Sequence, residues 1–144
     1  MTSTVCNTAS ETVNFAIEMA KSAQNGDVIC LCGELGAGKT VFAQGFAQGL
    51  QITQPVNSPT FTLLREYTGG TLNLYHFDLY RLCEFGNDSL DYETLEEIGF
   101  FDYLGTDGVC LIEWANFAKE FIPKQAQWLN ITRLKNESRK IQKI

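Results

Sequence analysis

A glycine-rich segment between two apolar stretches constrains the fold of this chain more than any other feature. Residues 33–40 read Gly-Glu-Leu-Gly-Ala-Gly-Lys-Thr, which fits the pattern G-x-x-x-x-G-K-S/T. The continuous apolar run Val28–Cys32 precedes it, and apolar residues recur at roughly helical spacing after it, as far as Leu50. Strand, glycine loop and helix in this order form the supersecondary unit of a P-loop. A dinucleotide fingerprint G-x-G-x-x-G is excluded, because Val41 stands where its third glycine is needed.

The residue types of this segment suit the binding of nucleotide phosphates. Glycines allow a tight backbone whose N–H groups point at phosphate oxygens, and the following helix adds the positive end of its dipole. We expect Lys39 to reach the β- and γ-phosphates and the Thr40 hydroxyl to ligate Mg²⁺. The sequence therefore predicts a site for ATP or ADP with Mg²⁺.

A P-loop also needs a carboxylate at the end of a second buried strand, and two residues qualify. Glu113 follows the apolar run 109–112, whereas Asp78 follows the strand-like segment 73–77. We assign Glu113 to the metal, directly or through water, and Asp78 to orienting the attacking water or to a second metal contact. An ordinary surface carboxylate is the alternative for each of them.

Two further polar residues near these strands are open to more than one interpretation. His76 is the sole histidine, and a lone histidine in a strand is more often structural than catalytic. The Ser58-Pro59-Thr60 turn lies between the loop and the later strands. It is either a γ-phosphate sensor, with Thr60 supplying a hydroxyl to metal or phosphate, or a plain turn.

Hydrophobic periodicity and turn residues predict one α/β domain over residues 1–144. A capping box at Thr8–Glu11 begins a first helix. The predicted elements are that helix to about residue 23, strands 28–32, 61–67 and 71–77, a helix over 89–104, a strand over 109–112 and an edge strand over 127–131. The leading fold is a P-loop NTPase-like three-layer sandwich with a mixed, mainly parallel central sheet.

The composition indicates a cytoplasmic globular protein. Hydrophobic residues make up 44% and charged residues 19%, and no apolar run approaches the roughly 20 residues that span a bilayer. The N-terminus has neither a basic start nor an apolar signal core. A net charge of −6 argues against a protein whose whole surface binds nucleic acid. Between Arg81 and Lys119 the chain has acidic residues and no Lys or Arg, which describes either a solvated face or an acidic docking surface.

Five blocks of sequence together resemble the TsaE (YjeE) family. They are the glycine loop 33–40, Ser58-Pro-Thr-Phe-Thr-Leu63, His76-Phe-Asp-Leu-Tyr-Arg-Leu82, Glu96-Glu-Ile-Gly-Phe-Phe-Asp-Tyr-Leu104 and Glu113-Trp114. These blocks stand in the family's order and cover most of the chain. The resemblance implies a bacterial P-loop ATPase needed to form N6-threonylcarbamoyladenosine at position 37 of tRNAs that read codons beginning with adenine.

The resemblance also implies site residues and partners. It implies a switch-like role for Thr60 and catalytic roles in hydrolysis for Asp78 and Lys39. It also implies metal binding by Thr40 and Glu113. The expected nucleotide-binding residues are Glu34, Leu35, Gly36, Ala37, Gly38, Lys39, Thr40 and Val41. Members of the family work with TsaD and TsaB and hydrolyse ATP slowly alone, so tRNA would be reached indirectly or weakly. Only Arg65 and Arg81 lie near the motifs in sequence, so we expect an activating arginine from a partner.

Three other functions compete with this one. A small P-loop kinase would need a lid with arginines and an acceptor pocket, yet only Arg65 and Arg81 are basic between Lys39 and Lys119. For a GTPase, Asp102-Tyr-Leu-Gly105 fits D-x-x-G by letter but lies in a helical stretch, and no N-K-x-D motif occurs. A nucleotide-dependent binding module overlaps the preferred interpretation, because a slow ATPase that resets a partner complex is partly a switch.

Overall fold

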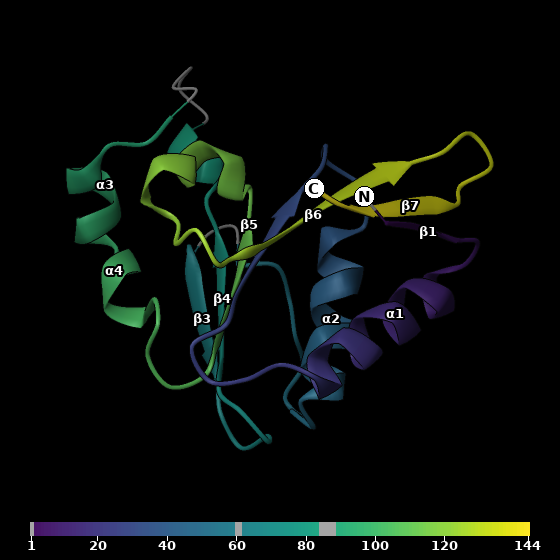
Figure 1. Cartoon of the computed structure of the whole chain (residues 1–144), viewed down its shortest axis with the longest axis horizontal. Helices are drawn as coiled ribbons and strands as arrows, with labels where there is room; N and C mark the ends of the chain where they lie inside the picture. Colours follow the sequence, from purple (N-terminus) through teal and green to yellow (C-terminus); the bar gives the residue numbers. More distant parts are fainter. Residues whose placement is uncertain (1, 60–61, 84–88) are drawn as a thin grey trace.

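The computed structural model describes residues 2–59, 62–83 and 89–144. It shows a mixed β-sheet with helices on both faces (Figure 1). The strands are β1 Ser3–Cys6, β2 Val28–Cys32, β3 Leu64–Tyr67, β4 Leu74–Asp78, β5 Val109–Glu113, β6 Gln127–Arg133 and β7 Arg139–Lys143. The helices are α1 Ala9–Lys21, α2 Lys39–Gly49, α3 Tyr92–Glu97 and α4 Phe100–Tyr103, with short 3₁₀ helices η1 Tyr80–Cys83 and η2 Ala115–Phe121. The predicted α/β fold with three layers is confirmed.

The sheet is parallel in its centre and antiparallel at both sides. Its strand order is β1-β7-β6-β2-β5-β4-β3. Strands β6, β2, β5 and β4 run parallel to one another, whereas β1, β7 and β3 pair antiparallel with their neighbours. Parallel pairing, predicted for most of the sheet, is therefore confined to this four-stranded centre. The carboxyl ends of the four parallel strands meet at one edge, which is where ligands bind in open α/β sheets.

Three sequence-based element assignments need correction. The strand expected over 127–131 is not at an edge, because β6 pairs with β2 on one side and with β7 on the other. The basic C-terminal residues form β7, which pairs with β1, and neither strand was predicted. The single helix expected over 89–104 is divided into α3 and α4 by Gly99, whose φ of 77° no regular helix contains.

Helices α1 and α2 pack together over one face of the sheet. The predicted capping box begins α1, since the Thr8 side chain accepts from the Glu11 N–H and Glu11 accepts from the Thr8 backbone. The two helices approach closely at Gly45 and Gly49, where an added Cβ would come within 3 Å of the backbone of α1. Ile29 and Leu31 of β2 contribute to the apolar core under this pair.

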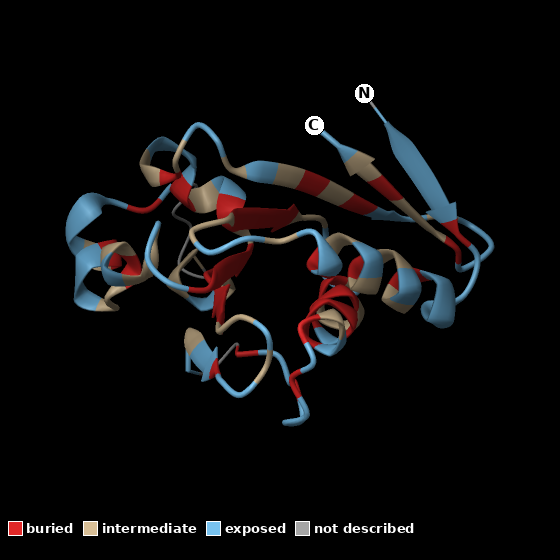
Figure 2. Ribbon diagram, turned by 60° about the horizontal axis from the view of Figure 1, so that its bottom comes forward, coloured by how far each residue is buried: buried red, intermediate tan, exposed pale blue. Residues whose placement is uncertain are grey.

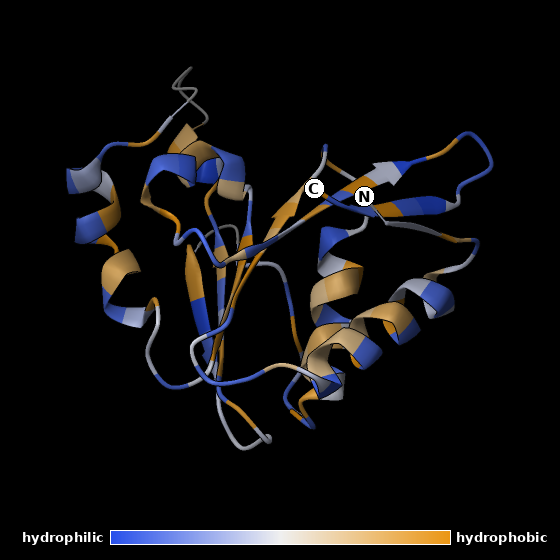
Figure 3. Ribbon diagram, viewed as in Figure 1, coloured by the Kyte–Doolittle hydropathy of each residue, from blue (hydrophilic) through white to orange (hydrophobic). Residues whose placement is uncertain are grey.

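The opposite face is covered by α3, α4 and η2 over a second apolar core. Alternate residues of β2, Val28 and Cys30, point to this side, as the period of a strand requires. Strands β2, β4 and β5 are accordingly buried on both faces (Figure 2). Hydrophobic residues, in orange, run along the centre of the sheet and also line α1 and α2 (Figure 3). None of the five cysteines, all of which lie among the described residues, forms a disulfide. Burial raises the pKa of Cys110 to about 12, which leaves this thiol protonated.

Candidate nucleotide-binding site

The glycine loop joins β2 to α2 in the conformation that its sequence predicts. Gly33, Gly36 and Gly38 all have positive φ values, of 147°, 79° and 110°. A side chain on Gly33 would also come within 2.5 Å of the Ile131 carbonyl oxygen of β6, so only glycine fits there. Gly38 is the N-cap of α2 and provides no side-chain cap, which leaves N–H groups of the first turn for a ligand.

Lys39 lies with its charged end against the loop itself. Its Nζ donates to the Gly33 carbonyl at 2.5 Å and to the Glu34 carbonyl at 2.9 Å. The same ammonium lies 4.1 Å from the centroid of the Trp114 ring, a cation–π contact that gives this tryptophan a place in the site. Burial lowers the pKa of Lys39, and the Glu113 and Asp78 carboxylates oppose that shift. Anionic phosphates would offer the ammonium stronger partners than these carbonyls.

A cavity of about 380 Å³ opens beside the loop and brings most of the predicted residues together. It is lined by Leu35, Gly36, Gly38, Lys39, Thr40, Val41, Ser58, Asp78, Tyr80, Glu113, Trp114 and Arg139. Glu34 and Ala37 line a different hollow, between the loop and β6. Thr60 lies outside the described residues.

Asp78 is fixed at the end of β4 through both of its oxygens. Oδ1 accepts from the Tyr80 backbone N–H at 3.0 Å, and Oδ2 accepts from the Ser58 hydroxyl at 3.2 Å. The carboxylate is only 3% exposed. The turn that contains Ser58 therefore reaches the site through this hydroxyl, a contact that the sequence did not predict.

Glu113 stands opposite Asp78 in the register of β4 and β5, at the same edge of the sheet. Its Oε2 lies 2.6 Å from Nε2 of His76, and both side chains are buried. His76 therefore holds the carboxylate that we assigned to the metal, and it is more than a core residue. Its position offers a signal, since residues i and i+2 of a strand share a face and His76 precedes Asp78 by two.

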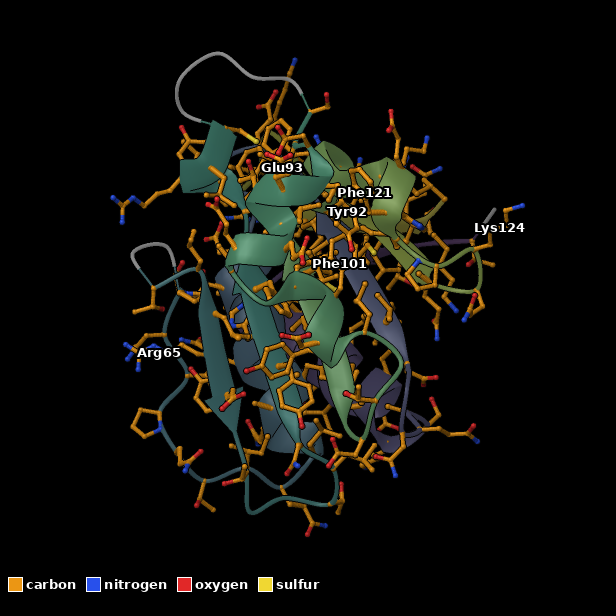
Figure 4. All side chains as sticks on the ribbon, turned by 90° about the vertical axis from the view of Figure 1, so that its left-hand side faces the viewer. Arg65, Tyr92, Glu93, Phe101, Phe121 and Lys124 are labelled. Carbon is orange, nitrogen blue, oxygen red and sulfur yellow. The ribbon has the colours of Figure 1, made fainter. Side chains whose placement is uncertain are left out.

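Arg139 is a second residue at the cavity that the sequence motifs did not indicate. It comes from β7, far along the chain, yet its Nη2 lies 3.5 Å from the Gly36 carbonyl of the loop. Arg65 points outward from β3 (Figure 4), and the exposed Arg81 does not line the cavity. The arginine at the cavity is thus one that lies far from the motifs in sequence, and neither of the two that lie near them lines it.

The donor set at the cavity fits Mg²⁺ bound together with a nucleotide. Across the described ranges, no three His, Cys, Asp or Glu side chains form a ready-made metal cage. Mg²⁺ does not need one, because it is typically held by one or two protein oxygens together with phosphate oxygens and water. The Thr40 hydroxyl and the Glu113 carboxylate line the same cavity and supply oxygens of this kind.

The match to a known family extends over nearly the whole chain. A family model described as "Threonylcarbamoyl adenosine biosynthesis protein TsaE" matches residues 6–141. The chain belongs to the TsaE family. The residues of the cavity therefore lie within the TsaE match.

Named TsaE proteins and a solved structure agree with this assignment. The tRNA threonylcarbamoyladenosine biosynthesis protein TsaE of Bacillus subtilis (strain 168) is 44% identical over 131 residues, which cover 91% of this chain and 77% of that protein. The protein of the same name from Treponema pallidum (strain Nichols) is 35% identical and covers 95% of this chain and 96% of its own length. The crystal structure of Bacillus subtilis YdiB has a TM-score of 0.79 and 38% identity, and covers 97% of this chain and 82% of that one. The TsaE fold is thus shared over nearly all of the chain.

Proposed function

We propose that this chain binds ATP or ADP with Mg²⁺, hydrolyses ATP slowly, and serves the formation of N6-threonylcarbamoyladenosine in tRNA. The observation that carries the proposal is the single cavity in which Lys39 and Thr40 of the glycine loop face Asp78 and Glu113. Phosphate-binding groups on one side and carboxylates on the other are the parts that P-loop hydrolysis requires.

The four polar side chains Lys39, Thr40, Asp78 and Glu113 have roles that their positions support. Lys39 exchanges the carbonyls of Gly33 and Glu34 for phosphate oxygens. Thr40 and Glu113 would hold Mg²⁺, which would supply positive charge to neutralise the phosphates. Asp78, fixed by Ser58 and by the Tyr80 N–H, orients the attacking water. Because Asp78 cannot rotate without losing these bonds, it is already positioned for that role.

The proposed role in tRNA modification rests on the names of related proteins. Relatives that are 44% and 35% identical over most of the chain are named tRNA threonylcarbamoyladenosine biosynthesis proteins. We propose TsaD and TsaB as the partners and a partner-activated ATPase as the mode of action. The net charge of −6 favours contact with these proteins over extensive direct contact with tRNA.

No helix among the described residues is both long and apolar enough to traverse a membrane.

ATP turnover by the purified chain, measured alone and with purified TsaD and TsaB, tests the proposal. We expect slow turnover that rises with both partners, and tRNA modification that depends on it. The variant Asp78→Asn serves as the control, since it should remain folded and bind nucleotide without supporting turnover. The partner hypothesis would be wrong if neither TsaD nor TsaB changed the turnover rate and neither protein associated with the chain.

A further inference from the structure

We infer that Arg139, the first residue of β7, binds the α- and β-phosphates of the nucleotide. It does so from the side of the glycine loop that faces away from the Asp78 and Glu113 carboxylates. This inference rests on the proposed function, because it names a further contact for the same nucleotide.

The sheet topology brings Arg139 to the loop. Strand β6 runs parallel to β2, so the carboxyl end of β6 lies at the same edge of the sheet as the glycine loop. Strand β7 begins there, since Arg139 is the register partner of Arg133 at the end of β6. The side chain then lies along the loop, with Nε 3.4 Å from the position that a Cβ on Gly38 would occupy.

The guanidinium has capacity left for an anionic ligand. Its protein partners are backbone carbonyls, namely those of Glu137 at 2.6 Å, Ser138 at 3.4 Å and Gly36 at 3.5 Å. The Glu137 carboxylate is 4.0 Å away and 65% exposed, so it neutralises the charge weakly. An arginine presents five N–H donors in a planar fork that fits phosphate oxygens, and Arg139 is 22% exposed at the cavity wall.

The position of the carboxylates decides which phosphates Arg139 reaches. Glu113 and Asp78 end β5 and β4, on one side of β2, whereas β6 and β7 lie on the other side. Mg²⁺ held by Thr40 and Glu113 would neutralise charge at the γ-phosphate end, so that end would lie on the carboxylate side. Arg139 therefore meets the opposite end of the phosphate chain, and it binds ATP and ADP alike instead of acting as an arginine finger on the γ-phosphate.

Titration of MgATP and MgADP into wild type and Arg139→Ala tests this assignment. We expect both affinities to fall by the same factor, about tenfold to a hundredfold, because a charge-assisted contact common to both ligands is lost. The rate of a single turnover at saturating ATP should stay within about twofold, since binding that is uniform between ground and transition states does not change the chemical step.

Lys140→Ala is the matched control, because it removes one positive charge from the next residue of β7, whose side chain does not line the cavity. Its affinities should match those of the wild type. Arg139→Lys keeps the positive charge but lacks the planar fork of five donors, so it should lose less affinity than Arg139→Ala. It also provides a second test if the alanine variant does not fold.

Two results would overturn the assignment while leaving the proposed function intact. One is unchanged MgADP affinity in both Arg139 variants while the wild type binds. The other is a loss confined to MgATP together with a fall in the single-turnover rate, which would place Arg139 at the γ-phosphate. A folded wild type that binds neither nucleotide would instead overturn the proposed function itself.

Discussion

At the scale of single residues, the two carboxylates of the cavity are held by different partners and should have different phenotypes. Asp78→Asn removes the group that we assign to the attacking water, so turnover should fall on the order of 10²- to 10⁴-fold with little change in nucleotide affinity. Glu113→Gln should instead raise the Mg²⁺ concentration needed for half-maximal turnover. Single-turnover rates measured across a Mg²⁺ series distinguish the two. A reversed pattern would exchange the roles of the two residues.

The buried Lys39 predicts how nucleotide affinity depends on pH. Burial lowers its pKa in the free protein below the usual 10.5, whereas bound phosphates stabilise the charged form and raise it. We therefore expect nucleotide to bind the protonated lysine and its affinity to decrease as pH rises through the lowered pKa. Titrations of MgADP between about pH 7 and 10 should show this decrease in the wild type but not in Lys39→Arg, which stays charged over this range. A decrease of the same size in both proteins would assign the titration to another group.

Local motifs predicted part of the site, and the fold supplied the rest. Lys39 and Thr40 follow from the spacing of the loop, and Asp78 and Glu113 from their positions after apolar runs. The contacts of His76 and Arg139 could not be found in this way, because each joins two residues that are distant in sequence. The roles assigned to all these residues stay predictions until variants are measured.

At the scale of secondary structure, burial on both faces separates the strands that could be predicted from those that could not. Strands β2 and β5 are continuous apolar runs, and their sequences alone indicate them. Strand β7 reads Arg-Lys-Ile-Gln-Lys with one buried apolar residue, so pairing with β6 and β1 determines it. The division between α3 and α4 likewise depends on the conformation of a single glycine, Gly99.

The close packing of α1 on α2 predicts a destabilising substitution at Gly45. Alanine raises helix propensity by about 1 kcal/mol, but its Cβ would lie 2.6 Å from the Val13 carbonyl oxygen and 2.9 Å from the Val13 Cα. Overpacking of this kind costs about 1–3 kcal/mol, and backbone atoms cannot move aside as a flexible side chain can. Gly45→Ala should therefore lower the free energy of unfolding in urea.

Gln48→Ala is the control for this substitution, since Gln48 is exposed on the same helix and should change stability by less than about 0.5 kcal/mol. A Gly45→Ala variant that is more stable than wild type would show that helix propensity outweighs the contact with α1.

Helix α3 carries the acidic surface that we consider for docking a partner. Its exposed side chains Glu93, Glu96 and Glu97 lie near an aromatic cluster of Tyr92, Phe101 and Phe121. Tyr92 is 53% exposed, and the cluster lies at the surface of this face (Figure 4). Asp91 is unsuitable for charge reversal, because its side chain caps α3 by accepting from the Thr94 N–H at 2.9 Å.

Reversing Glu93, Glu96 and Glu97 to lysine should therefore weaken association with TsaD and TsaB and leave MgADP affinity unchanged. Sedimentation of the mixed proteins measures the association, and titration of MgADP verifies that the site is intact. Association that survives the triple reversal would exclude this surface as the docking site.

At the scale of the whole molecule, the strand order separates positive from negative groups around the loop. Arg139 lies on the side of β6 and β7, and Asp78 and Glu113 lie on the side of β4 and β5. On our proposal, this arrangement would orient a bound nucleotide so that its metal and γ-phosphate lie toward the carboxylates. Ligand at about a hundred times its dissociation constant would stabilise the folded chain by roughly 2.7 kcal/mol.

Calorimetric titration of MgADP into the wild type and into Lys39→Ala tests the central claim most directly. We predict one nucleotide per chain in the wild type and at least about tenfold weaker binding in the variant, because a charge-assisted phosphate contact is worth roughly 1.5–3 kcal/mol. A variant that remains folded and binds MgADP as tightly as the wild type would show that the nucleotide lies elsewhere. Absence of binding to a folded wild type would contradict the claim altogether.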